Sequence, residues 1–494
     1  MGIIEKQATR NAVYSYLGAG LGFLTVMWMS HLFNPSENGV LRILVSYSAL
    51  FAQFANLGFT SVTNRFFPYF RNKDKGHHGF LFYALLITLI GFAICYVVFV
   101  FLQPSLIVRN QAKSPLFVTY LFYLMPLTFF TVFFNIFDSY LRATYNSVIG
   151  SFSKDFLQRI LIMALLLIYF LKIIEFRIFI LLYISLVCLP TIILLAFIVR
   201  QGEWHIRPIR GFMSAELRAE MIRLGVYSIL AGGAGAIILN IDAIMVNSML
   251  GEDKAGIYGI AFQFGTIILI PARSLYRIMT GIVAEAFKKE DLREIASLYA
   301  KSCNSQLTIG LLLFIGIAAN IDNIMQLLPP AYASGKYVIL ILSAGYLVEM
   351  ATGINQVIIA NSKYYRFDAF FVFLMVGLVV AANLIFIPKY GIAGSAIATA
   401  VTVVANNSLR FLFLKVTYKM QPYDLNSLKL LLISVVALAP GMLIPYTGHL
   451  IPDIAIRSAI VGGIFIFLIL KTEAAPELNG KIRKNLKHVG ITFL

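Results

Sequence analysis

Charged residues are scarce in this chain of 494 residues: they make up 13% of it, whereas hydrophobic residues make up 59%. A water-soluble domain carries about a quarter charged residues. The composition therefore excludes a soluble globular protein. Cysteine is rarer still, and Cys95, Cys188 and Cys303 are unevenly spaced within or beside apolar stretches. We expect them to be buried residues of helices, because free cysteine packs like a small apolar side chain.

Motifs that would support catalysis are missing as well. The sequence has no G-x-x-x-x-G-K-[ST] motif, so the chain is not expected to hydrolyse a nucleotide itself, and it has no H-E-x-x-H motif. His77 and His78 have no carboxylate or thiol cluster beside them in the sequence, and two adjacent imidazoles are too few ligands for a metal site. The loops on the predicted outer side are short. The sequence thus predicts no enzyme activity, no catalytic residue, no metal and no cofactor.

What the sequence does have is a succession of long apolar runs. A hydrocarbon core about 30 Å thick is crossed by roughly 20 apolar residues in a helix. Fourteen stretches meet that requirement and predict an all-α integral membrane protein with about 14 transmembrane helices. The predicted spans are 12–33, 41–63, 80–103, 116–141, 156–174, 178–199, 224–249, 257–283, 304–328, 337–360, 367–387, 391–414, 429–446 and 454–471.

The positive charges are distributed unequally between the two sides of the membrane. The formal net charge is +17. If the N-terminus is inside and the chain crosses the membrane fourteen times, 31 of the 40 Lys and Arg residues lie on the inner side. Inner loops of membrane proteins are enriched in these residues, so both termini are predicted to be cytoplasmic. The basic excess therefore indicates orientation and contact with anionic lipid rather than a nucleic-acid partner.

The two halves of the sequence repeat a common pattern. Residues 34–43 close the first helical hairpin and residues 251–260 the fourth, and their glycines Gly39 and Gly256 are 217 residues apart. Six crossings separate the hairpins, so the halves share one orientation, as in a parallel repeat. The pattern predicts two pseudo-symmetric six-helix lobes plus two C-terminal helices. The domains would be an N-lobe at 1–200, a cytoplasmic linker at 201–220, a C-lobe at 221–418, and the last two helices with a basic tail at 419–494.

Polar side chains recur on one face of corresponding helices in the two halves. In the span 257–283 they follow helical steps of three, four and seven residues, which places them in one stripe. The offset of 217 or 218 residues relates the stripes of the two halves. From these stripes we predict a substrate-binding cavity formed by Arg273, Arg277, Arg142, Gln263, Asn56, Gln53, Tyr346 and Gln356. The carboxylates predicted to couple transport to an ion are Asp242, Glu349 and Asp138.

A polar stripe inside a membrane has more than one interpretation. Gly18, Gly232 and Thr399 suit close packing between helices, where small and hydroxylic residues are enriched. An ionised side chain near the bilayer centre costs at least about 2.5 kcal/mol, so the charged members require either a structural ion pair or a water-filled cavity. We favour the cavity for Asp242 and Glu349. Arg142 lies near the inner interface, where a long side chain reaches water easily.

Four segments carry a resemblance to a known family. They are residues 34–39 in the first hairpin, residues 56–59 followed by Arg65, residues 242–258 and residues 387–399. With them, the whole chain resembles the polysaccharide-transport, Wzx-type flippases of the multidrug/oligosaccharidyl-lipid/polysaccharide exporter superfamily, which carry O-antigen and other lipid-linked oligosaccharides. Family members often have an acidic residue where this chain has Asn56.

The resemblance implies a V-shaped pair of six-helix lobes that works by alternating access in the bacterial inner membrane. The implied function is translocation of undecaprenyl-diphosphate-linked oligosaccharide for surface polysaccharide biosynthesis, including lipopolysaccharide. The implied partners are the lipid-linked substrate, membrane lipids, H⁺ or Na⁺ as coupling ion, and polysaccharide polymerases and glycosyltransferases.

Other functions remain as alternatives. The nearest is a cation-coupled multidrug or small-molecule exporter of the same superfamily, which would favour an acidic cavity. A membrane glycan ligase or polymerase would need an external loop bearing Arg or His, which the short outer loops do not provide. A scaffold without transport would leave the charges within the spans unexplained.

Overall fold

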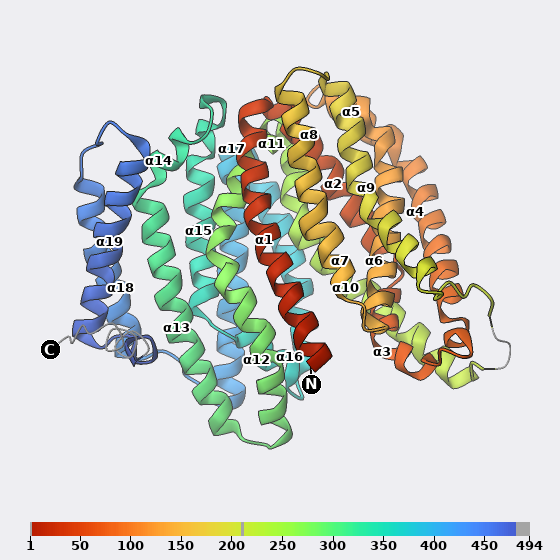
Figure 1. Cartoon of the computed structure of the whole chain (residues 1–494). Helices are drawn as coiled ribbons and strands as arrows, with labels where there is room; N and C mark the ends of the chain where they lie inside the picture. The colour runs from red at the N-terminus through yellow and green to blue at the C-terminus, as the bar shows by residue number, and fades with distance from the viewer. Residues whose placement is uncertain (1, 209–211, 481–494) are drawn as a thin grey trace. The chain divides into compact units, whose positions relative to one another are not determined.

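The regular elements of the chain are helices. The computed structural model describes residues 2–208 and 212–480, and no strand occurs in this part (Figure 1). The chain packs into two units, Met1–Gly259 and Ile260–Leu494. The predicted all-α membrane fold is therefore confirmed.

The first unit is organised around α2, which packs against α4, α6 and α10. A second group of contacts joins α1, α8 and α9. The elements in chain order are α1 (Gly2–Leu32), α2 (Pro35–Ala55), α3 (Phe59–Phe70), η1 (Gly76–Gly79), α4 (Phe80–Asn110), α5 (Pro115–Tyr120), η2 (Leu121–Tyr123), α6 (Leu124–Ala143), α7 (Val148–Ser151), the π-helical η3 (Phe152–Leu157), α8 (Gln158–Phe170), α9 (Phe176–Arg200), α10 (Ala215–Leu250) and α11 (Glu252–Gly265), whose last residues belong to the second unit.

In the second unit, α15 packs against α13 and α17, and the hairpin of α18 and α19 packs against α13 (Figure 1). The elements are η4 (Thr266–Leu269), α12 (Ile270–Lys288), α13 (Leu292–Ala319), α14 (Ile321–Gln326), η5 (Pro330–Gly335), α15 (Lys336–Ala351), α16 (Asn355–Asn361), α17 (Tyr365–Tyr418), α18 (Leu425–Leu443) and α19 (Leu450–Thr472).

The predicted span 41–63 is divided by a bend. Its first part, α2, begins with a capping box in which the Asn34 side chain and Glu37 bond each other's backbone N–H, and Pro35 occupies the first helical turn. The helix ends at Ala55, and α3 starts at Phe59 after a bend of 45°. Two consecutive residues with positive φ separate the two helices. A local break of this kind exposes backbone groups that a side chain must satisfy.

Helix α17 contains two of the predicted spans and folds back on itself. A straight helix rises about 1.5 Å per residue, so residues 42 positions apart would be roughly 60 Å apart. Yet Arg410 Nη2 lies 2.9 Å from Asp368 Oδ1. The reversal occurs at Gly391, whose φ of 58° and ψ of −136° interrupt the helix. Glycine suits this position because it has no Cβ to disfavour the backbone angles. The two arms correspond to the predicted spans 367–387 and 391–414.

Length and hydropathy identify ten helices in the described residues that are able to cross a membrane, or eleven if the bent pair α2–α3 counts as one span. The two arms of α17 count once in that total. The multi-pass character is thus confirmed, whereas the number of fourteen crossings stays a prediction.

Helix α10 packs with the first unit rather than the second. It contacts α2 and α3, and the unit that contains it extends to Gly259. The predicted N-lobe ended at residue 200. The packing thus groups α10 with helices that precede the predicted linker, whereas the sequence repeat assigned residues 221–418 to the C-lobe. The division into two six-helix lobes stays a prediction.

Candidate functional site

Asp242 and Tyr258 form a buried pair between α10 and α11. The Tyr258 hydroxyl donates a hydrogen bond to Asp242 Oδ2 at 3.0 Å, and Asp242 is 5% exposed. Arg42 of α2 is an electrostatic neighbour of Tyr258, and a Cβ added to Gly259 would lie 3.2 Å from Arg42 Cγ. Asp242, predicted to couple transport to an ion, therefore belongs to a polar cluster of α2, α10 and α11 within the first unit.

Gln53 in the last turn of α2 and Asn56, which caps its C-terminus, have different partners. The Asn56 side chain is 3% exposed and bridges the bend, because Nδ2 donates to the Thr60 hydroxyl and Oδ1 accepts from the Thr60 backbone N–H at 3.1 Å. Gln53 lies against Gly232 of α10, where an added Cβ would be 2.2 Å from Gln53 Nε2. In the first unit, Asn56 thus stabilises the junction of two helices.

Asp138 and Arg142 form an ion pair at positions i and i+4 of α6. The Arg142 side chain is 46% exposed, whereas that of Asp138 is 14% exposed and lies beside Gly150 of α7. Lys154 of η3 is an electrostatic neighbour of Asp138, and its Nζ lies 4.4 Å from the centre of the Phe134 ring. The pair therefore has a cationic environment, with the guanidinium at its exposed end.

In the second unit, a cluster of charged residues surrounds the buried Arg410. Its guanidinium pairs with Asp368, and Arg410 is 5% exposed. Glu349 of α15 is an electrostatic neighbour of both Arg410 and Arg273. Tyr276 of α12 is an electrostatic neighbour of Glu349 and Arg410. The cluster thus brings together α12, α15 and both arms of α17.

Our sequence reasoning missed Arg410 and Asp368 as site residues. We counted Arg410 among the 31 Lys and Arg residues of the inner side. The sequence does contain a signal for the pairing of these two residues. Asp368 precedes Gly391 by 23 residues, and Arg410 follows it by 19. Opposite charges at similar distances from a helical reversal lie at similar depth and can pair.

Arg273 and Arg277 are exposed on α12. Neither guanidinium lies within 4.0 Å of a carboxylate in the part of the chain that the structure describes. Residues four positions apart on a helix are neighbours on one face, with Cβ atoms about 5–6 Å apart. The two side chains therefore present a double positive charge without an ion-paired anion.

The remaining predicted residues have mixed environments. Tyr346 is buried, whereas Gln263 and Gln356 are half-buried. Other polar residues near these positions link helices: Thr352 and Asn355 both donate to Asn407 Oδ1 of α17, at 2.9 Å and 3.1 Å. Part of the polar stripe therefore serves helix packing, as the alternative interpretation expects.

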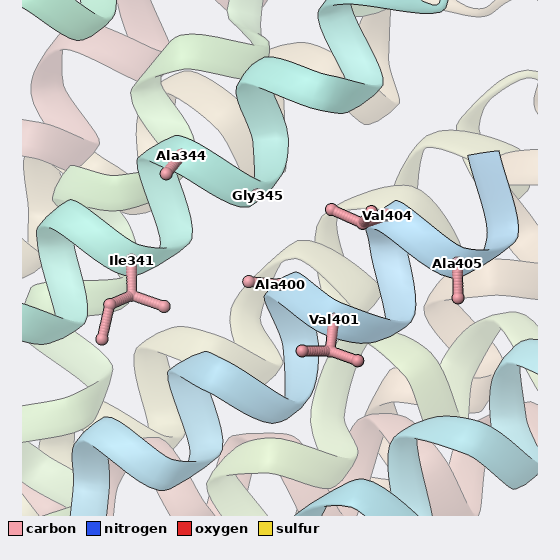
Figure 2. A pocket seen from close by; sticks show the side chains of 7 residues that line it. All are labelled: Ile341, Ala344, Gly345, Ala400, Val401, Val404 and Ala405. Atoms are coloured by element: carbon pink, nitrogen blue, oxygen red, sulfur yellow. The ribbon is translucent and has the colours of Figure 1, made fainter. Parts of the chain in front are cut away.

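Two cavities in the described part of the chain lie away from the residues of the predicted substrate site. One, of about 490 Å³, lies between α15 and the second arm of α17 and has an apolar lining (Figure 2). Another of about 490 Å³ lies between α3, α4 and α10. None of the eleven predicted site residues lines either cavity.

The histidine pair of the loop between α3 and α4 is bound to protein groups. His77 Nε2 lies 2.7 Å from Glu203 Oε2, and its Nδ1 accepts from the backbone N–H of Asn72. His78 stacks on Phe212 with ring centroids 3.7 Å apart. Among the residues described, no group of three or more His, Cys, Asp or Glu side chains is placed to hold a metal ion.

Long apolar helices in two units, with charged residues inside them, define a multi-pass membrane protein. The chain belongs to the family described as polysaccharide biosynthesis protein, whose model matches residues 6–275, more than half of the sequence. This match confirms the family resemblance inferred from the sequence. No curated protein sequence matches the chain significantly.

Solved structures of the multidrug/oligosaccharidyl-lipid/polysaccharide exporter superfamily share this fold. The lipid II flippase MurJ in an inward closed conformation superposes with a TM-score of 0.72 at 14% identity, covering 93% of this chain and 97% of that one. A multidrug resistance MATE family transporter in an inward-facing conformation gives 0.64 at 14% identity, covering 82% and 97%. A superfamily transporter from Pyrococcus furiosus, reported with a binding pocket of reverse polarity, gives 0.54 at 14% identity, covering 83% and 94%.

Proposed function

We propose that this protein is a flippase that moves undecaprenyl-diphosphate-linked oligosaccharide from the cytoplasmic to the outer leaflet of the bacterial inner membrane. Two findings support this: membership of the polysaccharide biosynthesis family and a fold shared with the lipid II flippase MurJ. Both termini would be cytoplasmic, as the distribution of Lys and Arg predicts.

The observation that carries the proposal is the pair of exposed arginines on α12. Arg273 and Arg277 have no ion-paired carboxylate in the described part of the chain, whereas the nearby buried Arg410 is paired with Asp368. A charged side chain in a membrane span is costly unless water or a partner stabilises it. Guanidinium groups bind phosphate oxygens through two parallel hydrogen bonds, so two neighbouring arginines suit a diphosphate.

The other predicted residues complete the proposed site. Gln263 and Gln356, which are half-buried, would hydrogen-bond sugar hydroxyls, as would the phenol of Tyr346. Arg142, Asn56 and Gln53 are the candidates in the first unit, with Asn56 also bridging the bend after α2.

Ion coupling would use the carboxylates within the helices, of which Asp242 is buried and Glu349 and Asp138 are half-buried. Glu349 lies in the field of Arg273 and Arg410. If substrate phosphate binds Arg273, the phosphate neutralises part of the positive charge that stabilises the Glu349 carboxylate. Uptake of H⁺ or Na⁺ would then balance the negative charge of Glu349. Asp242 and Asp138 are the corresponding candidates in the first unit.

The experiment replaces Arg273 and Arg277 by Ala together. Surface glycan is measured in cells that lack the native gene, with equal amounts of each variant in the membrane. We expect export to fall by about tenfold or more, since each charge-assisted contact contributes roughly 1.5–3 kcal/mol. Lys288→Ala is the matched control, because Lys288 is an exposed cation at the end of the same helix.

A binding assay separates this function from drug export. The purified protein should bind undecaprenyl diphosphate more tightly than undecaprenol, and the double variant should lose that preference. Unchanged glycan export in the double variant would refute the proposal. Drug sensitivity that depends on the gene, without any effect on glycan, would favour the multidrug alternative.

A further inference from the structure

The first unit contains a cavity that the proposed transport does not use. It lies between α3, α4 and α10 and has a volume of about 490 Å³, within the usual range of about 300–1,000 Å³ for ligand sites. Arg218 is the single charged residue of the lining. The lining residues are Leu57, Phe59, Val62, Tyr83, Ile87, Met213, Arg218, Met221, Ile222, Gly225, Val226 and Ile229.

The cavity follows α10 with its charge at one end. Arg218 and Ile229 are eleven residues apart, a rise of about 16 Å along a helix. Arg218 precedes the predicted span 224–249 by six residues, on the side that the Lys and Arg distribution assigns to the cytoplasm. With this predicted span and orientation, the guanidinium would lie at headgroup level, and Val226 and Ile229 would lie at the level of the acyl chains.

We propose that this cavity binds one acyl chain of an anionic phospholipid of the cytoplasmic leaflet, with its phosphate on Arg218. An elongated apolar cavity with a cation at its interfacial end is complementary to that ligand in shape and charge. Glu216 and Glu220 lie on the same helix but do not line the cavity.

The bound lipid would stabilise the contact of α10 with the bend between α2 and α3. Gly225 lines the cavity, and its carbonyl oxygen would lie 2.2 Å from a Cβ added to Gly58. The backbones of the two segments are therefore in direct contact beside the ligand. A chain that fills the adjacent space adds dispersion contacts to both segments and opposes their separation.

Native mass spectrometry of the full-length protein tests this proposal. The protein is freed of lipid and then titrated with phosphatidylglycerol or with phosphatidylcholine. We expect tighter binding of phosphatidylglycerol, and Arg218→Gln should weaken it by about fivefold, the effect of one interfacial cation. Arg223→Gln is the matched control, because Arg223 is an exposed cation of the same helix outside the lining.

A second variant tests the apolar part of the cavity. Val226→Trp would fill the space that the acyl chain occupies and should weaken binding of phosphatidylglycerol while the protein stays monodisperse. Ile222→Trp serves the same purpose if the first variant does not fold. Equal binding of the two lipids, equal effects of Arg218→Gln and Arg223→Gln, or unchanged binding in the filled variant would overturn the proposal. Displacement of phosphatidylglycerol by undecaprenyl phosphate would also overturn it, by identifying a polyprenyl chain as the occupant.

Discussion

Gly39 and Gly256 contact each other through their backbones, and the contact is reciprocal. A Cβ added to Gly39 would lie 1.8 Å from the carbonyl oxygen of Glu252, and one added to Gly256 would lie 1.9 Å from that of Pro35. Pro35 and Glu252 are separated by the same 217 residues as the glycines. Equivalent residues that exchange contacts in this way are arranged around a local two-fold axis. The starts of α2 and α11 therefore pack as related copies.

The close approach of these glycines predicts a loss of stability when either gains a methyl group. Gly39→Ala and Gly256→Ala should each lower the free energy of unfolding by about 1–3 kcal/mol, because an added atom must displace backbone. Thermal unfolding in detergent measures the effect. Gly20→Ala in α1 is the control, since nothing lies within 4 Å of its added Cβ. A control as unstable as the two variants would contradict the prediction.

The ion pair of Asp368 and Arg410 predicts a strong asymmetry between single and double substitutions. Arg410→Gln should destabilise the protein by about 3 kcal/mol, because it removes a buried cation and leaves the half-buried Asp368 carboxylate without its partner. Asp368→Asn combined with Arg410→Gln should recover part of that loss. Thermal unfolding of Arg410→Gln, Asp368→Asn and the double variant gives the coupling between the residues.

An exposed ion pair serves as the comparison for Asp368 and Arg410. Lys289 Nζ lies 2.7 Å from Glu285 Oε1, and both side chains are more than half exposed. Lys289→Gln should leave stability unchanged within error, because solvent screens such pairs. If both pairs behave alike, the cluster around Arg410 has no special role in the second unit.

The hydrogen bond between Tyr258 and Asp242 predicts the effect of removing one hydroxyl. Tyr258→Phe deprives a buried carboxylate of a donor and should cost about 1–3 kcal/mol. Thermal unfolding and glycan export are measured on the same variant. Tyr337→Phe is the matched control, since Tyr337 is 64% exposed. A harmless Tyr258→Phe would show that the hydroxyl does not stabilise Asp242.

The Asn56 side chain predicts a localised defect at the bend between α2 and α3. Asn56→Ala removes the acceptor of the Thr60 N–H, and loss of such a cap costs about 0.5–2 kcal/mol. Hydrogen exchange should rise first at the start of α3. Asn240→Ala is the control, because its side chain bonds a carbonyl four residues earlier within one helix. Faster exchange confined to other helices would contradict this assignment.

Several features of the fold followed from the sequence. The separate spans 367–387 and 391–414 were expected from hydropathy, and the structure reverses the chain at Gly391. The start of α2 was not: Asn34 caps the helix and Glu37 lies in its first turn, whereas the predicted span began only at residue 41. The bend after Asn56 was not expected. Hydropathy is continuous through residues 41–63 and carries no information on the positive φ angles of Leu57 and Gly58.

The candidate site was less predictable than the fold. Arg273 and Arg277 were selected from their stripe, and both are exposed on α12. Arg410 was missed, because its partner Asp368 is 42 residues away and only the reversal of α17 brings them together. Asn56 was selected because a polar side chain could line a water-filled cavity. In the structure both hydrogen bonds of its side chain go to Thr60.

The sequence by itself determined that this is a helical membrane protein, because apolar length and charge bias are properties of short segments that need no knowledge of neighbours. Its motifs also carried the resemblance to the family that the family-model match confirms. The tertiary structure decided which polar residues inside the helices have partners. Hydropathy specifies that a side chain is buried, whereas the contact that stabilises its charge comes from another helix, whose position depends on how the whole unit packs.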